Sequence, residues 1–182
     1  RTESWELTNT CHAASMQPEV TTTSIIDWDR DLAIHCRFTI LSGNASDTRF
    51  FCYLGIAHGD VSGWSETTDN SGLGSDNIIG FEVQNLDIFA GAYDGSTDTE
   101  TDTTANAVLG APQFITIEKV GTTVTWYHST TGLSYSQIHQ ETSNMPSGDS
   151  ASLHHSIAMA AGRTAASGNY RTNAAMLGVY YK

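Results

Sequence analysis

Oxygen-bearing side chains that could bind a metal ion or a sugar are concentrated in the polar stretch 57–77. Its hard oxygen donors, which suit Ca2+, are Asp60, Asp69, Asn70 and Asp76. An exposed indole at Trp64 would stack on a pyranose ring. We therefore predict ligand binding at Trp64, Asp69 and Asn70, and a metal site at Asp60 and Asp76 with Ca2+ as the candidate ion. Turn formation by Asp, Asn and Gly, and core anchoring by Trp64, are the alternatives.

A second acidic group has the alternating spacing that opens a calcium loop. It consists of Asp27, Asp29 and Asp31. An EF-hand then requires Gly at its sixth position and Glu at its twelfth. This chain has Leu32 and Phe38 there. A turn with solvated carboxylates is therefore the favoured interpretation of this group.

Histidine and serine patterns do not indicate a zinc centre or a serine hydrolase. His154 and His155 are adjacent, so on a strand they point to opposite faces. No pair of histidines has the His-x-His or His-x3-His spacing of a zinc site. No Gly-x-Ser-x-Gly sequence is present either. We expect the histidines to be surface residues or hydrogen-bonded, partly buried ones.

Short strands separated by turn residues are the elements that must position these side chains. The clearest alternation places Ile34, Cys36, Phe38 and Ile40 on one face. Apolar residues on both faces of 50–56 predict a central strand, and the Thr-rich stretch 94–106 predicts an exposed edge strand. Further strands are predicted at 78–84, 86–93, 114–119, 123–127, 137–141, 153–159 and 174–181. No convincing amphipathic helix is present, so we predict an all-β fold of two packed antiparallel sheets.

The length and charge of the chain restrict its organisation and its partners. A chain of 182 residues with 39% hydrophobic residues fits one domain. We predict an extended N-terminal arm at residues 1–24, which opens with a short strand at 5–7, and a β-sandwich at 25–182. The net charge of −12 argues against binding to nucleic acid or to anionic membranes.

Three cysteines do not form a closed disulfide framework, because their number is odd. Cys36 and Cys52 both fall on predicted inward faces. Buried free thiols are the favoured interpretation. A Cys36–Cys52 bridge is the alternative if their strands are neighbours.

The order of strands and turns resembles concanavalin A-like (laminin-G-like) jelly rolls, most closely those of phage tail and capsid-surface proteins. The resemblance rests on residues 28–38, on the hairpin formed by 79–83 and 88–95, on the hairpin formed by 114–119 and 123–127, and on 175–181. It covers roughly residues 25–182. It implies a two-sheet antiparallel jelly-roll sandwich. The family includes lectins, glycanases and inert virion modules.

A glycanase on this fold requires a suitably spaced pair of carboxylates. The related glucanases carry Glu-x-Asp-x-x-Glu on one strand, and a retaining mechanism needs two carboxylates about 5–5.5 Å apart. Here Glu82 is followed by Gln84 and Asp87, and Asp87 falls on the opposite face of a straight strand. Glu118 is another isolated carboxylate. We interpret both glutamates as solvated sheet-face charges and predict that the chain is not an enzyme.

The resulting functional expectation is a non-enzymatic surface module of a viral particle, such as a capsid decoration, fibre or tail-associated protein. Its partners would be further copies of itself as a homo-oligomer, other virion proteins and host-surface glycans. The arm at residues 1–24 is a candidate for subunit exchange or anchoring. A secreted carbohydrate-binding lectin is the first alternative and a glycoside hydrolase the second. The expected location is the virion surface or the extracellular space.

Overall fold

The computed structural model describes most of the strand-forming chain. Its backbone is described for residues 3–11, 19–22, 28–42, 51–58, 77–84, 86–94, 98–147, 155–162 and 168–181. Side chains are described for residues 28–40, 79–83, 86–92, 94 and 100–147. No helix of these described residues is long and apolar enough to cross a membrane.

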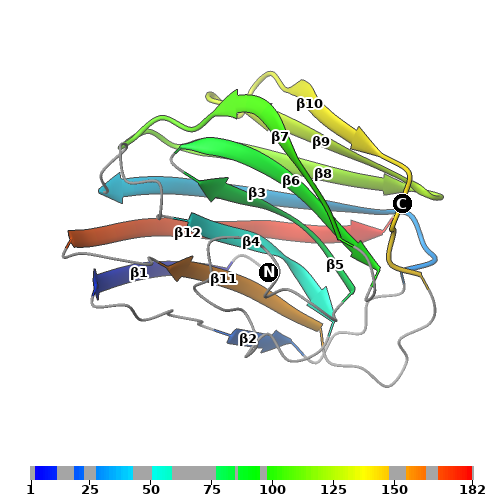
Figure 1. The fold of residues 1–182 in the computed structure, drawn as a ribbon, viewed down its shortest axis with the longest axis horizontal. Coiled ribbons are helices and arrows are strands. Elements are labelled where there is room, and N and C mark those ends of the chain that lie inside the picture. The colour runs from blue at the N-terminus through cyan, green and yellow to red at the C-terminus, as the bar shows by residue number, and fades with distance from the viewer. Residues whose placement is uncertain are drawn as a thin grey trace.

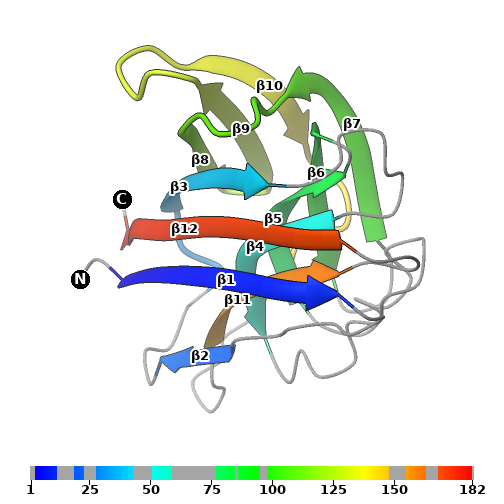
Figure 2. The same cartoon turned by 90° about the vertical axis from the view of Figure 1, so that its left-hand side faces the viewer.

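The described residues include twelve strands, which form two six-stranded sheets that lie against each other as a sandwich (Figure 1). The strands are β1 (Glu3–Cys11), β2 (Glu19–Thr22), β3 (Leu32–Ser42), β4 (Phe51–His58), β5 (Asn77–Gln84), β6 (Asp87–Asp94), β7 (Asp98–Asn106), β8 (Gln113–Val120), β9 (Thr123–Ser129), β10 (Ser136–Glu141), β11 (His155–Gly162) and β12 (Gly168–Tyr181). Sheet A has the order β1-β12-β3-β8-β9-β10, and sheet B has the order β2-β11-β4-β5-β6-β7. Every pairing is antiparallel. Figure 2 shows β1, β12 and β3 of sheet A side by side. The all-β sandwich predicted from the strand pattern is confirmed.

Alternation along β3 shows why these residues form half-buried strands. Its five inward side chains are all buried, namely Leu32, Ile34, Cys36, Phe38 and Ile40. Between them, Arg37 is exposed, and His35 donates to or accepts from the Thr116 hydroxyl at 2.9 Å on the outer face. A strand with one apolar and one polar face must cover the apolar one. The alternation predicted from the sequence is therefore confirmed for β3.

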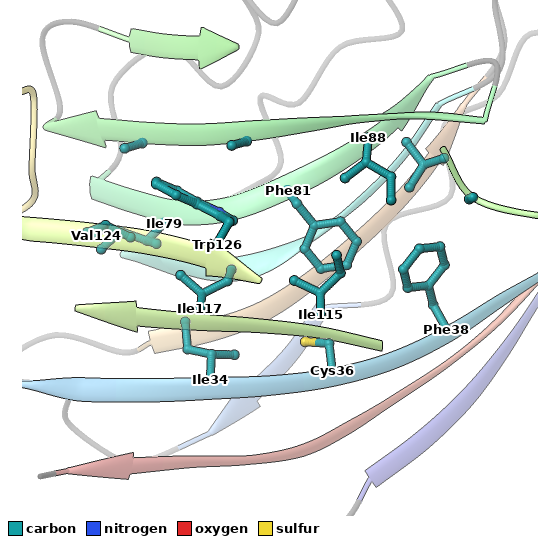
Figure 3. Close-up of a cluster of buried hydrophobic side chains, with 14 of the residues drawn as sticks. Ile34, Cys36, Phe38, Ile79, Phe81, Ile88, Ile115, Ile117, Val124 and Trp126 are labelled. Atoms are coloured by element: carbon teal, nitrogen blue, oxygen red, sulfur yellow. The ribbon is translucent and has the colours of Figure 1, made fainter. Parts of the chain in front are cut away.

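Side chains from both sheets meet in a single core (Figure 3). Sheet A contributes residues of β3, β8 and β9, and sheet B contributes residues of β5 and β6. The rings of Phe38 and Phe81 lie across the interface with their centroids 5.3 Å apart. Removing this apolar surface from water is the main favourable contribution to folding.

One hydrogen bond crosses the core between the two sheets. Trp126 on β9 is 1% exposed, and its indole Nε1 donates to the backbone carbonyl of Gly80 on β5 at 2.7 Å. A buried indole N–H needs an acceptor, and a polar bond in an apolar interior fixes the position of both partners. The sheets are therefore held in one relative position at this point.

The ends of the sandwich are fixed by hydrogen bonds from turns. The β8–β9 turn contains Gly121, which has a positive φ of 57° and donates its N–H to the Asp31 carboxylate at 2.7 Å. Lys119 is buried, and its ammonium group donates to the Gly121 carbonyl at 2.8 Å. Asp31 therefore holds a hairpin turn through its carboxylate, and Asp29 is exposed in a turn, as the turn interpretation predicts. Asp27 lies outside the described residues. At the other end, the Gly110 N–H donates to the Ile40 carbonyl at 2.8 Å.

Several predicted elements are confirmed, whereas the N-terminal segment differs from expectation. β4 is a central strand between β11 and β5, β7 is the edge strand of sheet B, and β10 lies close to the predicted 137–141. Residues 1–24 were expected to be a polar arm without regular structure apart from a short opening strand. Their described parts instead form β1, paired with β12, and β2, paired with β11. Main-chain pairing at a sheet edge needs no apolar pattern, which explains the missed strands. The division into an exchangeable arm and a sandwich stays a prediction.

Cys36 is a free buried thiol on sheet A. Cys52 belongs to β4 in sheet B, so the two strands are not neighbours and the condition for the alternative disulfide is not met. Burial raises the pKa of the Cys36 thiol to about 12. Cys36 therefore remains a protonated, apolar member of the core at physiological pH.

Replacing Trp126 by Phe should destabilise the fold. Trp126→Phe keeps an aromatic ring in the core but removes the donor to Gly80, so we expect a loss of about 1–3 kcal/mol in the free energy of unfolding. Urea denaturation measures this loss. Tyr127→Phe, on the outer face of the same strand, is the matched control and should stay within about 0.5 kcal/mol of the wild type. Equal effects of the two variants would contradict a special role for the bond.

Cys36 should resist alkylation in the native protein. Because its pKa is raised to about 12, little thiolate forms at neutral pH, and burial excludes the reagent. Incubation with iodoacetamide followed by mass spectrometry should leave Cys36 unmodified. The same treatment in urea should modify it fully. Rapid native modification would show that the core opens at this position.

Candidate functional site

The outer face of sheet B is the described surface best suited to hold a ligand. On β5, the inward residues Ile79, Phe81 and Val83 are fully buried. Gly80 and Glu82 alternate with them and so lie on the outer face. The neighbouring strands can be placed on this face through their pairing registers.

Three glycines form a row across the middle of this face, which we call the glycine row. Gly55 on β4 pairs with Gly80 on β5, and Gly80 pairs with Gly91 on β6. Glycine inside a strand weakens the strand, and it often marks a place where a ligand or another backbone approaches closely. The row is therefore a strip of backbone without side chains that runs perpendicular to the strands, and its described members Gly80 and Gly91 are buried.

A second row, parallel to the glycine row, carries side chains. In this row Glu82 on β5 pairs with Phe89 on β6, and Phe89 pairs with Asp102 on β7. Glu82 is 4% exposed, Phe89 is half-buried and Asp102 is exposed. At the end of the glycine row, Gly91 pairs with Glu100, which is also exposed. Bare backbone is thus bordered by one aromatic ring and three carboxylates.

A β-bulge fixes the orientation of Asp102. The register of β6 with β7 shifts between Asp87 and Phe89, and Thr104 on β7 has a positive φ of 60°, which a β-branched residue rarely adopts. The Asp102 carboxylate accepts the Thr104 N–H at 2.8 Å, and the Thr103 hydroxyl donates to the Ile88 carbonyl at 2.6 Å. Bulges commonly re-aim a side chain beside a binding site. Here the bulge holds one oxygen of Asp102 and leaves the other for an external donor.

The charge of this face is uniformly negative. None of the six strands of sheet B contains Lys or Arg, whereas β5, β6 and β7 contain Glu82, Asp87, Asp94, Asp98, Glu100 and Asp102. Carboxylates accept hydrogen bonds and repel anions. The face can therefore bind an uncharged hydroxyl-rich molecule, whereas an anionic one would be repelled.

The residues predicted from the sequence as ligand and metal sites are not on this face. Trp64, Asp69 and Asn70, together with Asp60 and Asp76, lie in 59–76, outside the described residues. Among the side chains that the structure describes, no group of three His, Cys, Asp or Glu residues could hold a metal ion. The proposed ligand and Ca2+ sites therefore stay predictions.

One sequence-based interpretation differs from the structure. Glu82 was interpreted as a solvated charge, and this is wrong because the residue is 4% exposed. Trp28 and Trp126 are both buried in the core.

Sequence patterns do not indicate Phe89, Glu100, Asp102 or the glycine row as a site, because their proximity arises from strand pairing. A signal for part of the row was present. Gly80 and Gly91 lie equally far from the turn that joins β5 to β6, so a regular hairpin would pair them.

Comparison with known proteins identifies the fold. No known family and no curated protein matches the sequence. Among solved structures, lectin II from Ulex europaeus is 10% identical with a TM-score of 0.59, and the match covers 100% of this chain and 98% of that one. The carbohydrate recognition domain of Emp46p is 9% identical with a TM-score of 0.61, covering 98% and 88%. A family 7 alginate lyase in complex with product is 8% identical with a TM-score of 0.59, covering 100% and 80%. The chain therefore has the jelly-roll sandwich fold of the concanavalin A-like class.

Proposed function

We propose that this chain is a non-enzymatic glycan-binding module whose ligand lies along the glycine row of sheet B. The observation that carries the proposal is the border of this row, where half-buried Phe89 lies beside the exposed residues Glu100 and Asp102. A sugar ring could stack on Phe89 and donate its hydroxyls to Asp102 and Glu100. The similarity in fold to lectins supports this function.

The ligand class follows from charge. Because sheet B contains no Lys or Arg and the chain has a net charge of −12, an anionic polysaccharide would be repelled. The proposed ligand is therefore a neutral glycan. Neighbouring strands are about 4.8 Å apart, so a linear glycan crossing β6 and β7 could contact one strand with each successive ring.

The setting we propose is the exterior of a viral particle, where the module would attach the particle to host glycans. The support for this setting is the resemblance of residues 25–182 to jelly rolls of phage tail and capsid-surface proteins. A secreted lectin would use the same surface in the same way. Negative-stain imaging of particles labelled with an antibody to this chain would distinguish the two settings.

An inverting glycoside hydrolase is a second candidate, favoured by the pairing of Glu82 and Asp102 with the same residue, Phe89. Two strand steps of about 4.8 Å separate them by roughly 9.6 Å, which is close to the 6.5–9.5 Å spacing of inverting carboxylates. Phe89 lies between them, however, and Asp102 already accepts the Thr104 N–H. These two features favour binding over catalysis.

Replacing Phe89 by Ala should weaken glycan binding. Loss of the stacking ring should raise Kd for a neutral glycan by roughly tenfold, which corresponds to about 1.4 kcal/mol. A glycan array containing neutral and anionic oligosaccharides identifies the ligand, and calorimetry measures Kd. Phe114→Ala is the matched control, because Phe114 is a half-buried aromatic residue on the outer face of sheet A. No binding across the array, or equal losses in both variants, would refute the proposed site.

Replacing Glu82 by Gln distinguishes binding from hydrolysis. Gln has the same shape as Glu but cannot donate the proton that an inverting mechanism requires. We expect no release of reducing ends from the bound glycan by the wild type or by Glu82→Gln. If the wild type hydrolyses the glycan and Glu82→Gln does not, the chain is a hydrolase and the proposed binding module is refuted.

A further inference from the structure

One edge of the sandwich is closed by strands from both sheets. β10 is the last strand of sheet A and β7 the last strand of sheet B, and the two strands contact each other. We call this contact the β7–β10 seam. β10 pairs with β9 through an irregular register, which shifts between Gln137 and His139. An irregular edge strand has fewer backbone hydrogen bonds to hold it than a regular inner strand has.

A partly buried histidine lies at the irregular point of this edge. The His139 ring packs on the Trp126 indole with centroids 5.4 Å apart. Its Nε2 atom is buried and has no hydrogen-bond partner in the described structure. The same indole donates to the Gly80 carbonyl, so His139 contacts the donor of the hydrogen bond that joins the two sheets.

The charged groups around His139 offer little compensation for an added proton. On its own strand, Glu141 attracts positive charge, but its carboxylate accepts the N–H groups of Thr142 and Ser143 at 2.7 and 2.8 Å. On β9, the inward residues beside Trp126 are Val124 and His128, and the Nε2 of His128 is hydrogen-bonded to Gln113.

Neither β7 nor the segment after β10 brings a compensating carboxylate into the seam. Glu100 and Asp102 on β7 belong to the outer face of sheet B, where they pair with Gly91 and Phe89. The described segment that follows β10, residues 142–147, carries no charge. A proton on the buried Nε2 of His139 would therefore have no close acceptor among these groups.

We propose that His139 is an acid-sensitive latch of the β7–β10 seam. A protonated imidazole gains an acceptor when the ring leaves the indole and reaches water, so protonation favours a state in which β10 is detached from the edge. Detachment exposes one face of Trp126 and the free edge of β9. The seam is closed at neutral pH and opens on mild acidification.

The direction of the pH dependence is set by burial. Desolvation lowers the pKa of His139 below its ordinary 6.5, and the charge of Glu141 raises it in part. The closed state therefore binds a proton less readily than the open state, and the stability of the seam falls as pH falls through 6.5 toward the lowered value. Burial also lowers the pKa of His128, which acts in the same direction. Glu141, whose pKa is lowered from 4.5 chiefly by its hydrogen bond from Ser143, acts in a more acidic range.

Hydrogen exchange at β10 tests the latch in the full chain. Between about pH 7.5 and about pH 5.5, exchange of the peptide covering Ser136–Glu141, corrected for intrinsic rates, should accelerate by up to about tenfold, the limit that an open-state imidazole pKa of 6.5 sets over this range. His139→Phe keeps a ring on Trp126 without a titrating nitrogen, and its β10 should lose most of this acceleration. His128→Gln is the matched control and should keep most of it, losing only the share that His128 contributes.

Three results would overturn the latch. They are equal exchange of wild-type β10 at both pH values, the same acceleration in His139→Phe, and loss of the acceleration in His128→Gln. If His139→Phe does not fold, NMR titration of the wild-type His139 ring decides the question. A midpoint at or above 6.5 would refute the latch, and a midpoint below 6.5 that coincides with β10 exchange would support it.

Discussion

The hydrogen bond from Trp126 to Gly80 links the two halves of this protein. It starts on sheet A, crosses an otherwise apolar core and ends on the backbone of the strand whose outer face carries the candidate site. The Gly80 carbonyl accepts the bond from Trp126, and the same residue pairs with Gly55 and Gly91 in the glycine row. The rigidity of the proposed binding surface therefore comes from the interior behind it, a common arrangement in preorganised sites. The same indole also supports His139, so the site, the core and the edge of the sandwich share one residue.

The arrangement of strands could largely be predicted from local patterns, because one buried face imposes a period of two on the sequence. β3 is the clearest case, since each of its inward residues is apolar and the residues between them are polar or small. β1 could not be predicted to its full length, because residues 8–11 are polar and Thr-rich and their strand conformation comes from pairing with β12. Edge pairing through the main chain leaves little trace in side-chain pattern.

The candidate site was much less accessible to sequence reasoning. A search for carboxylate partners along one strand found none for Glu82, since its row continues on β6 and β7. Asp102 pairs with Phe89 because of the register shift at the β7 bulge, and no local sequence pattern predicts this register. Burial of Glu82 was likewise unpredictable, since alternation assigns a residue to a face but does not show what covers that face. The residues favoured from the sequence, Trp64 and its acidic neighbours, were selected by composition alone.

The lack of basic residues in sheet B has a consequence for the durability of the protein. Between Arg49 and Lys119 the chain contains neither Lys nor Arg, so β4, β5, β6 and β7 all lie within one uninterrupted segment. Proteases that cleave after basic residues have no target there, even when a strand transiently separates from its neighbours. Lys119, at the end of that segment, is buried and its ammonium group is held by the Gly121 carbonyl. This part of sheet B is therefore intrinsically resistant to cleavage by trypsin-like proteases.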